Sequence, residues 1–306
     1  MDISRRFFLA LAASMASGAA RAAQDVEEID LWPAPFAAPE GTQLTETTDD
    51  KGAITGVLRP RLRYYRPSKP VGTAILVAAG GGYKRIEAAK ESTPACLWLQ
   101  SLGIAAFELI YRLPREMAST TAPFEDAQRA MRVVRSLAPT HSFESGSIGM
   151  MGFSAGGHLA GITATRPNTE YLPVLDDIDT KSARPDFAAL LYPIITLMAP
   201  YDGSSTRVQL IGHHPSHHDS AEWSVEHHVD ADSPTMFLAH AEDDPISPVE
   251  NSVMMYRALE DSSVAAELKL FHTGGHGWGM GRAGTEPAAW PNEFHHWCRS
   301  AGFLHI

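Results

Sequence analysis

One stretch decides the fold of this 306-residue chain: Gly152-Phe153-Ser154-Ala155-Gly156-Gly157-His158. It follows an apolar run, Ile148 to Met151, and precedes a helical stretch of small residues, His158 to Thr165. A G-x-S-x-G pattern between a strand and a helix is typical of a nucleophile elbow, a tight turn that lifts the serine hydroxyl clear of a sheet. Such a turn leaves no room for side chains two residues before and two after the serine. Ser154 is therefore the candidate nucleophile.

Composition and charge narrow the class of protein. Apolar residues make up 44% and charged residues 20% of the chain, which fits one large globular α/β domain. The formal net charge is −11 and no basic stripe accompanies it, so nucleic acid is not expected as a partner. Two cysteines, Cys96 and Cys298, are too few for a disulfide framework. We expect two separate buried thiols, with a single Cys96–Cys298 pair as the alternative.

The first 22 residues resemble a twin-arginine export signal. Ser4-Arg5-Arg6-Phe7-Phe8-Leu9 leads into an apolar segment, Phe7 to Ala16, that is too short to span a bilayer. Ala20-Arg21-Ala22 supplies the small residues that a signal peptidase needs, so we expect cleavage after Ala22. This predicts a periplasmic or secreted protein with no membrane contact after cleavage. An amphipathic N-terminal arm is the alternative.

Strands and helices alternate after an extended leader over residues 23–55. Continuous apolar runs of strand length, such as 73–79, are typical of strands buried on both faces. The predicted strands cover 58–65, 73–79, 104–111, 147–152, 187–194, 235–240 and 266–271. The predicted helices cover 87–102, 124–137, 158–165, 249–259 and 288–301. The alternation predicts an α/β domain over 56–306, with a mostly parallel sheet, helices on both faces and a small loop-rich insertion at about 196–230.

Two local features add detail to this prediction. Pro60 cannot donate to a sheet ladder, so the strand at 58–65 is expected at the edge of the sheet. Arg129, Arg132 and Arg135 follow the polar side of the 124–137 helix and are expected to form a solvated face.

A glycine triplet ends the strand at 73–79. In Gly80-Gly81-Gly82 the backbone N–H groups can approach an anion without interference from Cβ atoms. We expect the amides of Gly81, Gly82 and Ala155 to form an oxyanion hole. A flexible turn is the alternative. A phosphate-binding P-loop is excluded, because no Gly-Lys-Ser/Thr follows the glycines.

The candidate general base is His276. It lies in Gly274-Gly275-His276-Gly277-Trp278-Gly279, directly after the last predicted strand. In a parallel sheet this strand end faces the same edge as the elbow, where a base must lie to take the serine proton. Tyr83, after the glycine triplet, and Trp278, beside the base, are candidate substrate contacts.

The candidate acid follows the strand at 235–240, where Asp243 and Asp244 are adjacent. Asp244-Pro245-Ile246-Ser247-Pro248 matches the D-P-x-x-P pattern of such loops, so we choose Asp244, with Asp243 as the alternative. The order Ser154…Asp244…His276 is that of α/β-hydrolases and differs from that of chymotrypsin-like and subtilisin-like proteases.

Several adjacent histidine pairs raise the question of a metal site. They are His213-His214, His217-His218, His227-His228 and His295-His296. Neighbouring side chains point in different directions on most backbones, and no H-E-x-x-H spacing accompanies them. We predict no metal and no cofactor. His158, inside the elbow helix, is expected to be a packing or capping residue.

With these residues placed, the chain resembles exported α/β-hydrolases of the bacterial acetyl xylan esterase and related carbohydrate esterase type. The resemblance covers roughly residues 55–300. It is carried by Gly80-Gly81-Gly82-Tyr83, Lys90-Glu91, Tyr111-Arg112-Leu113, Asp126-Ala127-Gln128-Arg129-Ala130, residues 152–160, Asp243-Asp244-Pro245 and Gly274-Gly275-His276-Gly277. It implies a serine esterase that hydrolyses short-chain, acetyl esters of carbohydrates through an acyl-enzyme.

Other functions stay open as alternatives. A general short-chain carboxylesterase would carry the same residues. A prolyl-oligopeptidase-like peptidase shares the catalytic order but needs a large gating domain, which residues 23–55 cannot supply. A non-catalytic binding module is favoured only where a catalytic position is lost, and all are filled here. A xylanase is rejected because no paired-carboxylate site can be assembled. The expected partner is a small or oligosaccharide ester, and the oligomeric state is left open.

Overall fold

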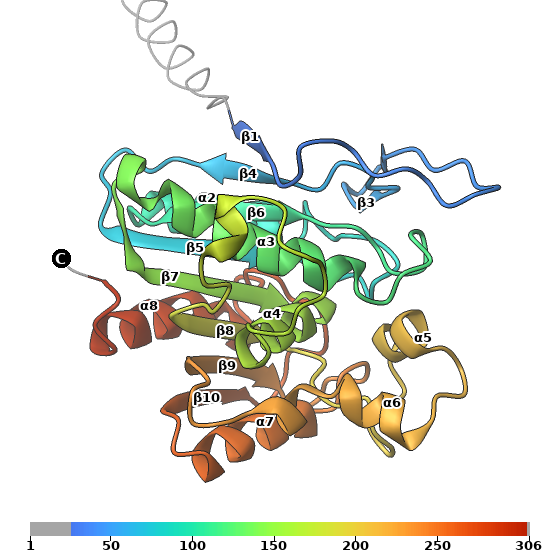
Figure 1. Cartoon of the computed structure of the whole chain (residues 1–306). Coiled ribbons are helices and arrows are strands. Elements are labelled where there is room, and N and C mark those ends of the chain that lie inside the picture. The colour runs from blue at the N-terminus through green and yellow to red at the C-terminus, as the bar shows by residue number, and fades with distance from the viewer. Residues whose placement is uncertain (1–25, 305–306) are drawn as a thin grey trace, which may run out of the picture.

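A sheet of eight strands forms the centre of the molecule (Figure 1). The structure, a computed structural model, describes residues 26–304. The strands are β1 (Glu27–Asp30), β4 (Arg61–Tyr65), β5 (Gly72–Ala78), β6 (Ala105–Ile110), β7 (Phe143–Phe153), β8 (Phe187–Leu191), β9 (Thr235–Ala241) and β10 (Ala266–Phe271), and two short strands, β2 (Thr47–Thr48) and β3 (Ile54–Thr55), pair separately.

The sheet is mostly parallel, as the sequence predicts. Its order is β1-β4-β6-β5-β7-β8-β9-β10. In this order, every adjacent pair among β6, β5, β7, β8, β9 and β10 is parallel. By contrast, β4 is antiparallel to β6, and β1 is antiparallel to β4. The carboxyl ends of six strands therefore meet at one edge, where the loops of an α/β site are built.

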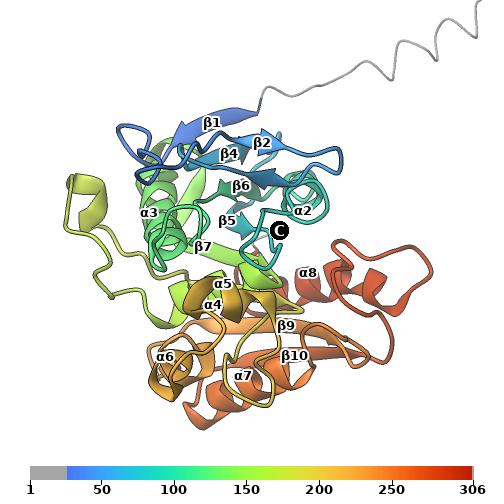
Figure 2. The same cartoon turned by 90° about the vertical axis from the view of Figure 1, so that its right-hand side faces the viewer.

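Helices cover both faces of this sheet (Figure 2). The helices of the described residues are α2 (Ser92–Ser101), α3 (Ala122–Leu137), α4 (Ala155–Thr165), α5 (Ser205–Ile211), α6 (His217–Glu222), α7 (Glu250–Asp261) and α8 (Trp290–Ser300), of which α5 and α6 lie beyond the sheet. Apolar side chains of α3, α4 and α7 share one buried cluster, and those of α2 and α8 share another on the opposite face. Cys96 and Cys298 lie in the second cluster as free buried thiols, which confirms the expectation of two separate cysteines.

The predicted edge strand lies inside the sheet. β4 has β6 on one side and β1 on the other, so the expectation drawn from Pro60 is wrong. Pro60 precedes the first strand residue, Arg61, and its carbonyl accepts a hydrogen bond from the N–H of Leu31 at 3.2 Å. The leader supplies the strand that covers this edge, because β1 pairs with all but one residue of β4.

Arg129 is not part of a solvated face. Its side chain is only 4% exposed. The guanidinium donates to Asp176 Oδ2 at 2.6 Å and to Asp179 Oδ1 at 2.8 Å, and it also reaches the carbonyl of Leu31 at 2.9 Å. The segment after α4, which includes a 3₁₀ turn at Asp177–Thr180, folds back over α3 and covers this arginine. The helical pattern of α3 alone cannot predict contacts with Asp176 and Asp179, which lie in a later segment of the chain.

The insertion at 196–230 is more regular than a loop. It contains α5, α6 and a 3₁₀ turn at Val225–His228. Ser204 caps α5, and Ser216 forms a capping box with Asp219 at the start of α6. In Figure 1 both helices lie beyond the carboxyl ends of the strands.

The predicted export signal falls outside the described residues. Within residues 26–304, no helix has the length and the apolar character that a membrane crossing requires. Every element described here belongs to the sheet and the segments packed around it.

Candidate active site

The elbow forms where β7 passes into α4. Ser154 has φ 52° and ψ −117°, a strained conformation that projects its side chain from the turn. A Cβ atom on Gly152 would lie 2.0 Å from the carbonyl oxygen of Gly156, and one on Gly156 would lie 2.2 Å from that of Ala78. Both positions therefore require glycine, as the sequence predicts.

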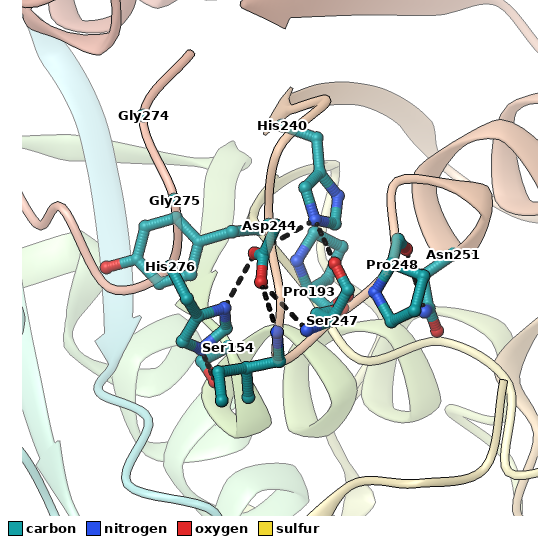
Figure 3. Close-up of polar contacts among 12 residues, drawn as sticks. Ser154, Pro193, His240, Asp244, Ser247, Pro248, Asn251, Gly274, Gly275 and His276 are labelled. Carbon is teal, nitrogen blue, oxygen red and sulfur yellow. Dashed lines mark hydrogen bonds and ion pairs between the residues drawn. The ribbon is translucent and has the colours of Figure 1, made fainter.

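Three side chains from separate strand ends meet at this turn (Figure 3). Ser154 Oγ lies 2.8 Å from His276 Nε2, and His276 Nδ1 lies 2.7 Å from Asp244 Oδ2. Because a carboxylate only accepts, Nδ1 carries the imidazole proton and Nε2 is free to accept the proton of Ser154. The structure thus brings together the three residues that the sequence nominates.

Asp244 is held as an anion. Its side chain is fully buried, which by itself would raise its pKa. Hydrogen bonds from His240, His276 and the Ser247 N–H outweigh that effect and lower the pKa to about 2. Asp244 Oδ1 also accepts from the N–H of Ile246 at 2.8 Å, so each carboxylate oxygen has its own donors.

Asp243 has a different task. Its Oδ1 accepts hydrogen bonds from the N–H groups of Gly274 and Gly275, at 2.8 and 2.7 Å. It therefore fixes the backbone of the loop that carries His276, while Asp244 contacts the imidazole itself. Asp244, the residue chosen from the sequence, is therefore the one in contact with the base, and Asp243, the alternative, is not.

His240 was not singled out by the sequence as part of the site. It is fully buried on the far side of Asp244 (Figure 3). Its Nε2 lies 2.8 Å from the Ser247 carbonyl and 3.3 Å from Asp244 Oδ2, while Nδ1 lies 2.7 Å from Ser252 Oγ. The only available signal was its position four residues before Asp244, at the end of β9.

The glycine loop faces the nucleophile. Gly81 and Gly82 line the cavity that opens at Ser154, and Ala155 begins α4 directly after it. The N–H groups of these three residues have no hydrogen-bond acceptor within residues 26–304. Free donors beside a nucleophile fit an oxyanion hole. Gly82 also contacts the insertion, since its carbonyl accepts from Ser205 Oγ at 3.3 Å.

The cavity itself is small and mostly polar. Its volume is about 280 Å³. Its walls, besides the residues already named, are Lys84, Arg85, Glu87, Lys90, Glu91, Ile194, Ser204, Ser205, Thr206, Ile246 and Gly277. A larger cavity of about 500 Å³ lies beside α3, but it contains none of the predicted catalytic residues.

Tyr83 does not line the cavity, which corrects its assignment as a substrate contact. Its backbone adopts φ 57°, its ring lies in the core, and only 1% of the residue is exposed. The hydroxyl lies 3.1 Å from His158 Nδ1, and the ring packs edge-on against Phe124.

Trp278 also lies outside the cavity lining, so its assignment as a substrate contact is corrected as well. Its ring packs behind the base, with its centroid 4.4 Å from that of Tyr192, whose own centroid is 5.0 Å from the His276 ring. Trp278 therefore supports the site through Tyr192 instead of facing the substrate.

His158 is a packing residue, as expected. Its Nε2 lies 2.7 Å from the Trp223 carbonyl, which can only accept, so Nε2 carries the proton and Nδ1 accepts from the Tyr83 hydroxyl. Burial lowers the pKa of His158 to about 4. The imidazole is neutral in the folded protein near pH 7.

This burial predicts a pH dependence of stability. Between the ordinary histidine pKa of about 6.5 and about 4, the unfolded chain binds a proton that the folded protein does not, so stability falls as the pH falls. From pH 7 to pH 4.5, His158 should account for a loss of about 2 kcal/mol in the free energy of unfolding. Denaturant unfolding of the wild type and of His158→Gln at both pH values measures this. Equal losses in the two proteins would contradict it.

The histidine pairs do not assemble a metal site. Across the described part of the chain, no group of three or more His, Cys, Asp or Glu side chains is placed to hold a metal ion. His213 and His214, for example, lie on the insertion with their ring centroids 6.5 Å apart.

The sheet and the elbow together define an α/β-hydrolase. Comparison with known proteins agrees, since residues 64–259 match the family model BD-FAE. The chain belongs to the BD-FAE family of α/β-hydrolases, and the resemblance inferred from the sequence is confirmed.

Two curated relatives share part of their length with this chain. An acetylxylan esterase of Xylanibacter ruminicola is 30% identical over 225 residues, which are 71% of this chain and 43% of that protein. Endo-1,4-beta-xylanase B of Butyrivibrio fibrisolvens is 31% identical over 211 residues, 66% of this chain and 32% of that protein. The chain thus spans less than half the length of these relatives.

Solved structures cover the chain more completely. The acetyl ester-xyloside bifunctional hydrolase of Caldicellulosiruptor lactoaceticus has a TM-score of 0.76 at 33% identity, over 91% of this chain and 97% of that one. The propionate-bound esterase Est2 of Thermogutta terrifontis has a TM-score of 0.68 at 25% identity, over 88% and 98%. The fold is therefore shared with ester hydrolases.

Proposed function

We propose that this protein is a serine esterase that removes short acyl groups, acetyl above all, from carbohydrates. The observation that carries the proposal is the hydrogen-bonded line Ser154–His276–Asp244, whose first two residues line a cavity. A nucleophile, an oriented base and a buried carboxylate in this order are what acyl transfer requires.

The proposed reaction has two halves. His276 takes the proton of Ser154 as Oγ attacks the ester carbonyl, and the amides of Gly81, Gly82 and Ala155 hold the oxyanion. The intermediate collapses as the alcohol leaves with the proton from His276. Water, deprotonated by the same imidazole, then attacks the acyl-enzyme. The bond between the acyl carbon and Oγ breaks, the acid is released, and His276 returns the proton to Ser154.

The polar lining of the cavity favours an ester whose alcohol part is polar. Ser204, Ser205 and Thr206 come from the start of α5, and Lys84 and Lys90 add further polar atoms. Such groups can hydrogen-bond a polyhydroxylated leaving group. The names of the relatives, an acetylxylan esterase and an acetyl ester-xyloside hydrolase, point the same way.

A xyloside-cleaving activity finds no support in this cavity. Its two carboxylates are Glu87 and Glu91. Glu87 is engaged by Arg85 at 2.5 Å, and both oxygens of Glu91 accept hydrogen bonds from protein groups. A glycosidase needs one carboxyl group free to act as an acid and another free to act as a base or nucleophile.

Acetate release from acetylated xylo-oligosaccharides tests the proposal, with 4-nitrophenyl acetate as the generic substrate. Release of acetate from both substrates supports a carbohydrate esterase. Hydrolysis of the nitrophenyl ester alone would leave a general carboxylesterase, and hydrolysis of neither would end the proposal.

We expect the cavity to favour short acyl chains. Because its volume is about 280 Å³ and Ile194 and Ile246 are its large apolar side chains, a longer chain finds little apolar surface to contact. The value of kcat/KM should fall from nitrophenyl acetate to butyrate to octanoate, because the added methylenes exceed what this small cavity can hold. The fall should be graded, since one methylene changes discrimination by only about 1–3 kcal/mol. An octanoate value equal to that of acetate would contradict a preference for acetyl groups.

Export remains part of the proposal. We propose that the mature protein begins after Ala22 and acts in the periplasm or outside the cell, where polymer-derived esters arrive. N-terminal sequencing of the protein purified from the periplasmic fraction tests this, and an intact Met1 in that fraction would overturn the cleavage.

A further inference from the structure

A buried carboxylate links the two loops that flank the nucleophile. Glu91 directly precedes α2 and is only 3% exposed. Its Oε2 accepts a hydrogen bond from the N–H of Gly80 at 2.6 Å, and its Oε1 accepts one from the Tyr192 hydroxyl at 2.9 Å. The mechanism above makes no use of this side chain.

Tyr192 extends the link to the loop of the base. Its hydroxyl, which donates to Glu91, accepts from the N–H of Gly279 at 3.0 Å. Its ring packs edge-on against the His276 ring. One continuous chain of hydrogen bonds therefore runs from Gly80, through Glu91 and Tyr192, to the loop that carries His276.

Resting on the proposed function, we propose that Glu91 is a positioning residue that sets the oxyanion-hole loop relative to His276. The loop needs such a restraint because Gly81 and Gly82 adopt φ 115° and 63° and glycine backbones have the most freedom to move. A Cβ atom on Gly80 would lie 2.6 Å from the Phe153 carbonyl, so this residue packs directly on the elbow. Fixing the Gly80 N–H thus fixes where the next two amides point.

The raised pKa of Glu91 helps to distinguish a positioning role from a contribution to the stability of the fold. Burial raises the pKa of Glu91, so ionising it in the folded protein is less favourable than in the unfolded chain. Stability contributed by such a group falls as the pH rises above its unfolded pKa. Replacing Glu91 by glutamine, which is neutral, similar in size and still has an acceptor oxygen, should therefore leave the protein folded at pH 7, while kcat falls.

The test compares Glu91→Ala, Glu91→Gln and Tyr192→Phe with the wild type on 4-nitrophenyl acetate. Glu91→Ala should lower kcat by about 10²-fold, with KM changed less than threefold. The displaced loop amides would stabilise the oxyanion of the transition state less well, whereas binding of the substrate would change little. Glu91→Gln should lose less, since its amide oxygen can still accept from Gly80. Tyr192→Phe should fall between the wild type and Glu91→Ala.

A boronic acid inhibitor, which mimics the tetrahedral intermediate, adds a second readout. Its Ki should rise in proportion to the loss in kcat across the three variants. Glu116→Gln is the matched control, because Glu116 is also a carboxyl group that accepts from a glycine N–H, that of Gly56 at 2.8 Å, and its pKa is also raised by burial. It does not line the cavity and should keep wild-type kinetics.

Wild-type kcat in folded Glu91→Ala would overturn the positioning role, as would an equal loss in Glu116→Gln. If Glu91→Ala does not fold, Glu91→Gln and Tyr192→Phe decide, and unchanged kcat and Ki in both overturn it. A wild-type chain without esterase activity would instead end the proposed function, so the two failures are distinguishable.

Discussion

Ser154→Ala is expected to keep the fold and to lower kcat for ester hydrolysis by roughly 10⁴- to 10⁶-fold. Oγ is the atom that forms the acyl-enzyme, and it lies 2.8 Å from the Nε2 that would take its proton. The elbow itself should survive, because its shape depends on Gly152 and Gly156.

Steady-state kinetics on 4-nitrophenyl acetate, with circular dichroism to confirm folding, measures the effect. The oxyanion donors stay in place in this variant, so a small residual rate above that of water is expected. A folded Ser154→Ala protein with more than a tenth of the wild-type rate would show that another group attacks the ester.

Asp244→Asn should lower kcat by roughly 10²- to 10⁴-fold, whereas Asp243→Asn should lower it less than tenfold. Asp244 uses both oxygens as acceptors, one for backbone N–H groups and one for His276. Asparagine has a single acceptor oxygen, so its NH₂ group must face one of these donors and disturb the imidazole tautomer. Asp243 uses only Oδ1, which asparagine can replace.

The two variants form a matched pair, because the same chemical change is made at adjacent residues. Their kcat values, with KM as a check on substrate binding, decide the assignment. A crippled Asp243→Asn beside an active Asp244→Asn would exchange the roles given to the two carboxylates.

Residues with a local pattern could be predicted from the sequence. Ser154 is flanked by the glycines that its turn requires, and the apolar run before it marks a buried strand. His276 lies 122 residues further along, yet parallel strands that end at one edge bring the two together. The parallel topology of the sheet therefore predicts that Ser154 and His276 lie close together, which the hydrophobic periodicity of each strand could not do.

Residues whose role depends on a distant partner could not be predicted in this way. Arg129 has the spacing of an outward side chain, but Asp176, 47 residues later, covers it. Tyr83 follows the glycine loop, yet its ring is buried beside His158 and Phe124. Glu91 and Tyr192 are 101 residues apart, so no local sequence pattern predicts their hydrogen bond.

The short helices of the insertion illustrate a different limit. α5 and α6 are seven and six residues long, too short to show a clear helical period. Their serine caps, Ser204 and Ser216, were the available signal, since a serine followed three residues later by an acid marks a helix start in α6.

The insertion also supplies part of the cavity wall from outside the sheet. Ser154, Asp244 and His276 lie at strand ends of the sheet, whereas Ser204, Ser205 and Thr206 reach the cavity from a segment inserted between β8 and β9. Exchanging that segment would present a new surface to the leaving alcohol without moving a strand. The architecture therefore allows substrate range to be engineered in this segment, provided that its contact with the Gly82 carbonyl is kept.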